Sequence, residues 1–254
     1  MTTANLIDMN YATVKDRRFE VAVLPVGATE PHNLHLPYGT DTLTVMALGE
    51  AACCEANKKG ASTVLLPAIP YGVDSNLMAF PLTMNCRPST HLAILRDIVD
   101  SLEKHQIHKL VILNGHGGNE FGPLVRELCG TTPVFLSIFE WWKAISREVA
   151  EIVEHPGDHA DEMETSISLH LFPDRVNMAA ADDGATKPCR LEAIEKGWVK
   201  ISRPWHLVTR NAGFGDPRKA TAEKGKQIFS LAVNRLSSYL VELSSAVMDE
   251  TFPY

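Results

Sequence analysis

Short apolar runs alternate with longer helical patterns along this 254-residue chain, and this alternation constrains the fold more than any other feature. The apolar runs occupy 21–26, 63–67, 109–113 and 133–139, and helical periodicity covers 42–59, 89–106 and 216–247. Strands that alternate with helices in this way are typical of parallel βαβ units. We therefore predict an α/β fold with a mainly parallel sheet. No internal repeat, low-complexity tract or clear linker divides the sequence, so we expect one domain over 1–254.

Local signals mark the ends of the predicted helices. Gly60 is a suitable C-terminal stop for the first helix. Ser89 is a suitable N-cap for the second helix. The third helix is predicted to begin at Asp216, because Pro217 suits the first helical position.

Side chains that ligate metals gather directly after two of the apolar runs. Residues 30–41 follow the first run and contain Glu30, His32, His35 and Asp41, and His116 follows the third run. In open α/β sheets, ligands bind beyond the carboxyl ends of parallel strands, so these loops are expected to share one crevice. Carboxylates and imidazoles together are what a hydrolytic divalent-metal centre requires.

A third acidic and histidine-rich segment covers 158–164 and includes His159 and Glu164. It is predicted to enter a helix that continues to Leu171. On that helix Asp161 and Glu164 lie three residues apart and share a face. The sequence therefore offers three separate segments that are able to supply one metal site.

Several of these residues also fit a structural role. Asp41 is able to cap a helix that begins at Thr42, although four ligand-type residues in one loop favour metal binding. His35, between two leucines, fits a packed and hydrogen-bonded histidine. Glu120 and Glu162 fit solvated or helix-start carboxylates better than ligands.

Two aromatic residues and several histidines carry weaker functional signals. Trp141 and Trp142 fit the core or an interface at least as well as a substrate wall. The glycines around His116 form a turn, and their lack of Cβ also permits close approach to a ligand. No functional role is assigned to four further histidines: His91, His105, His108 and His170.

Bulk properties exclude several classes of protein. The net charge of −7 provides no basic footprint for nucleic acid or anionic lipid. The N-terminal segment lacks the basic start and apolar stretch of a signal peptide, and no run of about 18 apolar residues predicts a membrane span. Five cysteines without a CxxC pair favour reduced thiols and a cytoplasmic location. A small-molecule substrate is the expected partner.

Four blocks, in order along most of the chain, resemble the creatininase (creatinine amidohydrolase) family. They are residues 24–42, 114–119, 159–166 and 213–217, the last followed by Ala220 and Gly225. The resemblance implies a three-layer α/β/α fold and a homo-oligomer, a hexamer in this family. It also implies two divalent metal ions per subunit, zinc being the first expectation and manganese or iron the alternatives.

By position, the resemblance implies that Glu30, Asp41 and His116 hold one metal, and that Asp41 bridges to a second metal held by His32. Creatininases proper place a glutamate where this chain has Gly118. We therefore expect Glu164 to complete the second site, with Glu120 as a substitute. A further departure is Asn33, where the family usually has glycine. Candidate substrate-binding residues are His35, Asn119, Trp141 and Trp142.

The predicted activity is hydrolysis by a hydroxide that bridges two metals, with His159 as the residue that carries a proton to the departing atom. The expected bond is a carbon–nitrogen bond of a small cyclic amide or a formamide. Gly118 and Asn33 leave open a second activity at the same site, on a lactone or on a ring carbon–carbon bond of a cyclic polyol ketone. A non-enzymatic metal-binding protein is the third alternative.

Overall fold

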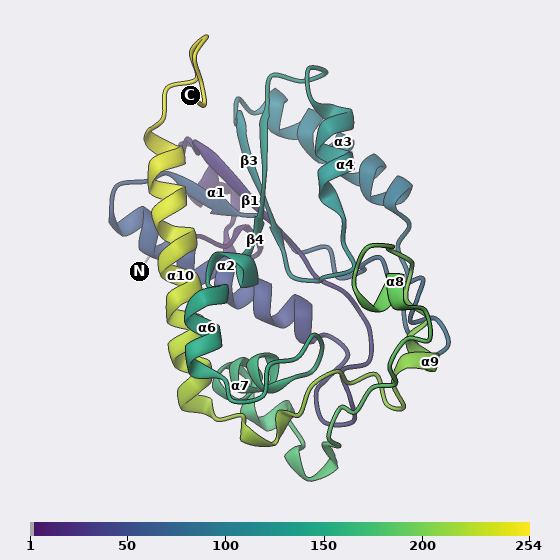
Figure 1. Cartoon of the computed structure of the whole chain (residues 1–254). Coiled ribbons are helices and arrows are strands. Elements are labelled where there is room, and N and C mark those ends of the chain that lie inside the picture. The colour runs from purple at the N-terminus through teal and green to yellow at the C-terminus, as the bar shows by residue number, and fades with distance from the viewer. Residues whose placement is uncertain (1–2) are drawn as a thin grey trace.

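A four-stranded, all-parallel sheet forms the centre of the computed structural model, which describes residues 3–254 (Figure 1). Its strands are β1 (Val21–Val26), β2 (Thr63–Leu65), β3 (Lys109–Asn114) and β4 (Phe135–Glu140), in the order β2-β1-β3-β4. Val23 of β1 lies between Leu65 of β2 and Val111 of β3. Every residue of β1 and β3 is buried, as expected of central strands covered on both faces.

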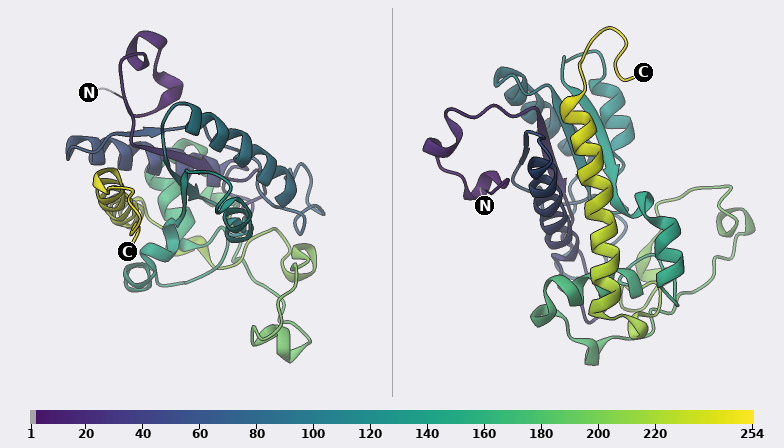
Figure 2. Two further views of the ribbon diagram at one scale, coloured as in Figure 1. Left: turned by 90° about the horizontal axis from the view of Figure 1, so that it is seen from above. Right: turned by 90° about the vertical axis from the view of Figure 1, so that its left-hand side faces the viewer.

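Helices cover both faces of this sheet. One face packs against α2 (Thr40–Lys58), α7 (Glu162–Leu171) and α10 (Ala222–Ser245), and the other against α3 (Pro88–Lys104) and α4 (Phe121–Leu128). Alternate strand residues serve the two cores, with Val21 and Val23 on the α2 side and Ala22 and Leu24 on the α3 side. The predicted three-layer α/β/α architecture is confirmed, and the two layers of helices are visible in Figures 1 and 2.

Short elements occupy the connections. They are α1 (Tyr11–Val14), α5 (Trp141–Ala144), α6 (Ser146–Ile152), α8 (Glu192–Glu195), α9 (Trp205–Val208), and single 3₁₀ turns at Leu6–Asp8, Pro173–Arg175, Met178–Ala180 and Pro217–Lys219. The connection that carries α8 extends away from the body of the molecule (Figure 2). No helix within residues 3–254 is both long enough and apolar enough to cross a membrane.

The predicted helices are present, but their starts differ from the prediction. The first begins at Thr40 instead of Thr42. Pro88 rather than Ser89 begins α3, because Pro88 takes the first helical position and Arg87 the N-cap. The C-terminal helix was predicted from Asp216, whereas Asp216 caps the separate Pro217–Lys219 turn and Thr221 caps α10 through the Lys224 amide. The predicted stop after α2 is confirmed, since Gly60 has a φ of +94°.

The strand order places a switch point between β1 and β3. The chain goes from β1 outward to β2, then passes over β1 to reach β3 on the other side. The connections that leave β1 and β3 therefore diverge, which opens a crevice at their carboxyl ends. The loops that carry the predicted ligands begin at these two strand ends, after Val26 and Asn114.

Candidate metal centre

Glu30 and His32 enter the crevice from the loop after β1, and both are fully buried. Nδ1 of His32 lies 3.1 Å from the carbonyl oxygen of Glu30 and donates a hydrogen bond to it. This bond fixes the orientation of the imidazole and leaves Nε2 directed into the crevice. Nε2 faces Oδ1 of Asp41 at 3.0 Å and Oε2 of Glu164 at 4.0 Å.

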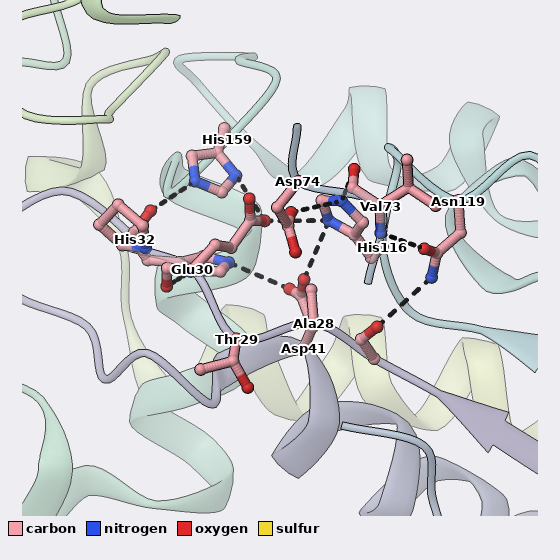
Figure 3. A network of polar contacts seen from close by, with 12 residues as sticks. Ala28, Thr29, Glu30, His32, Asp41, Val73, Asp74, His116, Asn119 and His159 are labelled. Atoms are coloured by element: carbon pink, nitrogen blue, oxygen red, sulfur yellow. Dashed lines mark hydrogen bonds and ion pairs between the residues drawn. The ribbon is translucent and has the colours of Figure 1, made fainter. Parts of the chain in front are cut away.

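Asp41 lies between two histidines (Figure 3). Oδ1 lies 3.0 Å from Nε2 of His32, and Oδ2 lies 3.2 Å from Nδ1 of His116. The side chain belongs to the first turn of α2, whose N-cap is Gly39 with no side-chain cap. The capping alternative for Asp41 is therefore wrong, because its two oxygens are directed into the crevice rather than to the helix amides.

His116 follows β3 and presents its two ring nitrogens to different carboxylates. Nδ1 lies 2.9 Å from Oε1 of Glu30, close to Asp41. Nε2, on the other side of the ring, lies 3.0 Å from Oδ1 of Asp74. Asp74 comes from the long loop after β2 and is fully buried. Figure 3 shows these three carboxylates directed at the His116 ring.

His159 and Glu164 reach the crevice from the segment that leads into α7. Asp161 caps this helix by accepting from the Glu164 amide at 3.0 Å, and Glu164 Oε2 accepts from the Ala160 amide at 2.6 Å. Nε2 of His159 donates to the carbonyl of Pro31 at 2.9 Å. Its Nδ1 then faces Oε1 of Glu30 at 3.8 Å. The helix cap and this turn together hold both side chains against the β1 loop.

The two histidines that face Asp41 strongly favour positive charge. Burial lowers the pKa of His32, but the Asp41 carboxylate outweighs burial and raises that pKa to about 10. Burial also opposes the charged form of His116, whereas Glu30 and then Asp41 and Asp74 hold the pKa of His116 well above its ordinary value. The buried carboxylates around these two histidines therefore favour the presence of positive charge.

The carboxylates divide into two groups by the direction of their pKa shifts. Burial would raise the pKa of Glu30 and Asp41, but the adjacent histidines outweigh it and lower both. Burial raises the pKa of Asp74 to about 7 and also raises that of Glu164 above its ordinary value. Buried carboxylates that compete for positive charge are typical of a site built around cations.

Unpaired oxygens identify where such cations fit. Within residues 3–254, no hydrogen bond of sound geometry reaches either oxygen of Glu30, Oδ2 of Asp41 or either oxygen of Asp74. Yet histidine nitrogens lie within 3.2 Å of Glu30 and Asp41. Buried carboxylate oxygens that lie this close to imidazole nitrogens without accepting a hydrogen bond are suited to act as ligands of an ion. The residue types, mixed carboxylate and imidazole, suit zinc, manganese or iron.

A cavity of about 560 Å³ opens directly onto these side chains. Its inner wall includes Glu30, Asp41, His116, His159 and Glu164. Its outer wall is polar and aromatic, and is formed by Ser75, Asn76, Glu120, Asp158, Lys200, Ser202, Arg203 and Trp205. A volume of this size accommodates a small molecule or the end of a peptide.

Other predicted residues lie elsewhere. His35 is buried against α7, where Nε2 lies 2.8 Å from Thr165 Oγ1, and burial lowers its pKa to about 4. The Asn119 amide donates to Gly27 and Asn114 and accepts from Val73. Neither side chain is among the described residues that line the cavity. Both hold loops and helices of the site together.

The adjacent tryptophans also lie away from this cavity. Trp141 is buried in the core between the sheet and α10, and Trp142 packs edge-on against it with ring centroids 5.9 Å apart. In the described chain the tryptophan on the cavity wall is Trp205, whose ring packs edge-on against His159 at 5.0 Å. Trp205 gave no signal in the sequence, because it lies in a long connection without helical or strand periodicity.

The two glutamates that were predicted to be solvated behave differently. Glu120 is exposed at the start of α4, as predicted. Glu162 begins α7, so the predicted helix-start role is confirmed, but it is fully buried rather than solvated and forms a 2.6 Å ion pair with Lys224 of α10. Glu162 also accepts hydrogen bonds from the amides of Glu154 and His155. A partner 62 positions away along the chain explains why local reasoning missed its burial.

Asp74 was also missed, although a signal for it exists. It is the only acidic residue between 66 and 87, the connection that follows β2. The rule that parallel strands direct their carboxyl ends to one edge applies to β2 as much as to β1 and β3.

Comparison with known proteins identifies the family. The profile of the creatininase (creatinine amidohydrolase) family matches residues 7–240. The chain belongs to the creatininase family. A solved structure of a putative creatinine amidohydrolase from Bacteroides fragilis superposes with a TM-score of 0.92 at 35% identity, over 98% of this chain and 100% of that one.

Curated members of the creatininase family that resemble this chain differ in substrate. A 3-dehydro-scyllo-inosose hydrolase from Thermotoga maritima is 27% identical over 96% of this chain and 83% of its own length. A mycofactocin precursor peptide peptidase from Mycolicibacterium smegmatis is 28% identical over 84% of this chain and 81% of its own length. This protein is therefore a hydrolase of the creatininase family, and membership alone leaves its substrate open.

Proposed function

We propose that this creatininase-family hydrolase binds two divalent cations that share Asp41. Glu30, Asp41 and His116 would hold one ion, and Asp41, His32 and Glu164 the other. The observation that carries this proposal is the position of Asp41, with one carboxylate oxygen facing each histidine at 3.0 and 3.2 Å. A carboxylate that presents its two oxygens to separate groups of ligands is suited to bridging.

The family supports this choice of metals. Solved creatininases that share the fold include a manganese form and a zinc–zinc form of a variant, at TM-scores of 0.76 and 0.78. For this chain we propose zinc first, with manganese or iron as alternatives, since a mixed carboxylate and imidazole site accepts all three. When bound, such a pair of ions lowers the pKa of coordinated water and polarises a carbonyl oxygen of the substrate.

We assign proton transfer to His159. Its Nε2–H is engaged by the Pro31 carbonyl, so Nδ1 is the nitrogen available toward Glu30 and the cavity. Trp205 packs edge-on against the ring, with ring centroids 5.0 Å apart. An imidazole held in one tautomer, with its free nitrogen toward the cavity, is suited to accept a proton from the attacking water and then pass it to the departing atom.

The bond proposed for cleavage is a carbon–nitrogen bond of a small cyclic amide or a formamide. Peptidase and amidohydrolase activities among the relatives support this choice, since both cleave amide bonds. One observation favours a second candidate, cleavage of a lactone or of a ring carbon–carbon bond in a cyclic polyol ketone. The relative that matches 96% of this chain acts on an inosose, which is a polyol ketone, and the outer wall of the cavity is rich in hydrogen-bonding groups.

Elemental analysis of the wild-type protein and of Asp41→Ala tests the metal site. We expect about two ions per wild-type chain, the usual content of a bridged hydrolytic site, and a sharp fall in the variant. A substrate panel assayed alongside, with amine release scored separately from acid release, distinguishes the two candidate bonds. Glu127→Gln is the matched control, because Glu127 is an acid of α4 that lies near Arg96, outside both the cavity and the possible ligand groups.

Two outcomes contradict the proposal. A wild-type protein that retains one ion or none after careful loading excludes the bridged site. Equal metal content in Asp41→Ala and wild type removes Asp41 from the ligands.

A further inference from the structure

Asp74 contacts the His116 ring at its second nitrogen, and its carboxylate also lies near that of Glu30. Nδ1 of His116 faces Glu30 and Asp41 at 2.9 and 3.2 Å, whereas Nε2 faces Asp74 Oδ1 at 3.0 Å. The carboxylate is fully buried, and both of its oxygens lack a hydrogen bond of sound geometry from any residue in 3–254. A buried acid is costly unless it serves a charged or hydrogen-bonding partner. His116 is such a partner: its Nε2 also lies 3.5 Å from the Val73 carbonyl oxygen, and Oδ1 of Asp74, at 3.0 Å, is the nearer acceptor.

The His116 ring is fixed between two glycines. A Cβ at Gly118 would overlap Nε2 of His116 and lie 2.6 Å from the Val73 carbonyl oxygen. A Cβ at Gly72 would lie 2.9 Å from Cδ2 of His116 and 2.7 Å from the Ala28 side chain. The loop that carries Asp74 is therefore able to press against the ring only because neither position has a side chain.

Hydrogen bonds hold the Asp74 loop in this position. Asn119, which is bonded to both the β1 and β3 connections, accepts from the Val73 amide at 3.0 Å. Asn85 accepts from the Asp74 amide at 2.9 Å, and His91 donates to the Tyr71 carbonyl at 2.8 Å. Anchors on both sides of Asp74 fix its direction toward Nε2.

We infer that Asp74 is a positioning residue, which accepts the Nε2 proton of His116 and so keeps the Nδ1 lone pair directed at the metal that Glu30 and Asp41 share. Histidines that ligate a metal commonly donate their other ring N–H to a carboxylate, and this outer partner sets both tautomer and ring orientation. The inference rests on the proposed metal site and assigns to it a residue outside the ligand set.

Metal affinity provides the test. Wild type, Asp74→Asn and Asp74→Ala are titrated with Zn²⁺ in competition with a chromophoric chelator. Removal of an outer carboxylate typically lowers metal affinity about 10–100-fold, so we expect one ion to weaken by this factor in Asp74→Ala. Asp74→Asn keeps an acceptor oxygen without the charge, so it should fall between wild type and Asp74→Ala. Both variants should still bind as many ions as wild type at saturating Zn²⁺.

Asp158→Asn is the matched control. Asp158 lines the same cavity but pairs with Arg203 rather than with His116, so its variant should bind Zn²⁺ as wild type does. Circular dichroism of the metal-free variants confirms that each is folded before titration. Asn has nearly the shape of Asp, so Asp74→Asn keeps the test valid where Asp74→Ala does not fold.

Three results overturn the inference, and they are distinguishable from one another. Unchanged Zn²⁺ affinity in folded Asp74 variants shows that the carboxylate does not position His116. Loss of one ion at saturating Zn²⁺ shows that Asp74 is itself a ligand. A wild-type protein that takes up no Zn²⁺ removes the proposed function as well, whereas the first two results leave it intact.

Discussion

Gly225 provides a direct test of how the fold positions the site. It lies in the first turns of α10, where the helix crosses the backbone of α7. In Gly225→Ala, the added Cβ would overlap the carbonyl group of Ser166 and lie 2.9 Å from the Ile167 amide nitrogen. Backbone atoms have no rotamer that relieves such an overlap. The two helices must separate, and α7 carries Glu164 two residues before Ser166.

The cost follows from two opposing effects. Overpacking of a tight contact costs about 1–3 kcal/mol, and a backbone neighbour places this site at the upper end. The better helix propensity of alanine offsets up to about 1 kcal/mol of this destabilisation. We therefore expect the free energy of unfolding to fall by about 2 kcal/mol. For a domain of this size each kcal/mol shifts Tm by about 2–4 °C, so Tm should fall by about 4–8 °C.

The displacement should also reach the metal site. Functional groups must be held within about 0.5 Å of their working geometry, and the separation of α7 from α10 moves Glu164. The ion assigned to His32, Asp41 and Glu164 should weaken, whereas the ion assigned to Glu30 and His116 should not. Thermal unfolding followed by circular dichroism and Zn²⁺ titration measure the two effects separately.

Gly122→Ala in α4 is the matched control. A Cβ at Gly122 meets no heavy atom of residues 3–254 within 4 Å. This variant should be as stable as wild type or gain up to about 1 kcal/mol. A Gly225→Ala protein that melts like wild type refutes the packing argument. Lower stability with unchanged affinity for both ions refutes the link from helix packing to the site.

Two further predictions concern the histidines. In the metal-free protein, burial lowers the pKa of His32 but Asp41 outweighs it, so the pKa rises from 6.5 to about 10. Between these two pKa values the native state binds more protons than the unfolded state, so the free energy of unfolding should decrease as pH rises from 6.5 to about 10. Urea titrations at several pH values measure this free energy. A free energy of unfolding that rises over the same pH range contradicts the prediction. His159→Ala should keep its metal yet lose about 10²–10⁴-fold in kcat on the substrate that the panel identifies, and a fully active variant excludes His159 from proton transfer.

Much of the architecture was predictable because it depends on local periodicity. The four apolar runs became the four strands, and the helical patterns became α2, α3 and α10. From parallel strands alone, the loops that carry Glu30 and His116 were expected at one crevice. The structure places Oε1 of Glu30 2.9 Å from Nδ1 of His116. The starts of α3 and α10 were less predictable, because neighbouring capping residues compete and one residue decides the outcome.

What sequence reasoning missed depends on contacts between distant segments. Glu162 looks like a solvated helix-start residue until α10 brings Lys224 against it. Asp74 lies nine positions beyond the end of β2, and its loop reaches His116 because Asn119 holds it there. Trp205 reaches His159 from the extended connection between α7 and α10. None of these partners shares a periodic pattern with the residue that it contacts.

Absent side chains determine the geometry of this centre as much as the ligands do. Gly118 and Gly72 permit the Asp74 loop to approach His116, and Gly225 permits α10 to approach the helix that carries Glu164. A glutamate at position 118, which the family resemblance would lead one to expect, would have to displace His116 or the Val73 carbonyl in this structure. Glycine at 118 therefore leaves room for the segment of Val73 and Asp74 beside His116. Because the Asp74 loop occupies the room that a larger residue at 118 would need, the second ion that we propose would take its carboxylate from another segment, and Glu164 is an acid that already lies beside His32.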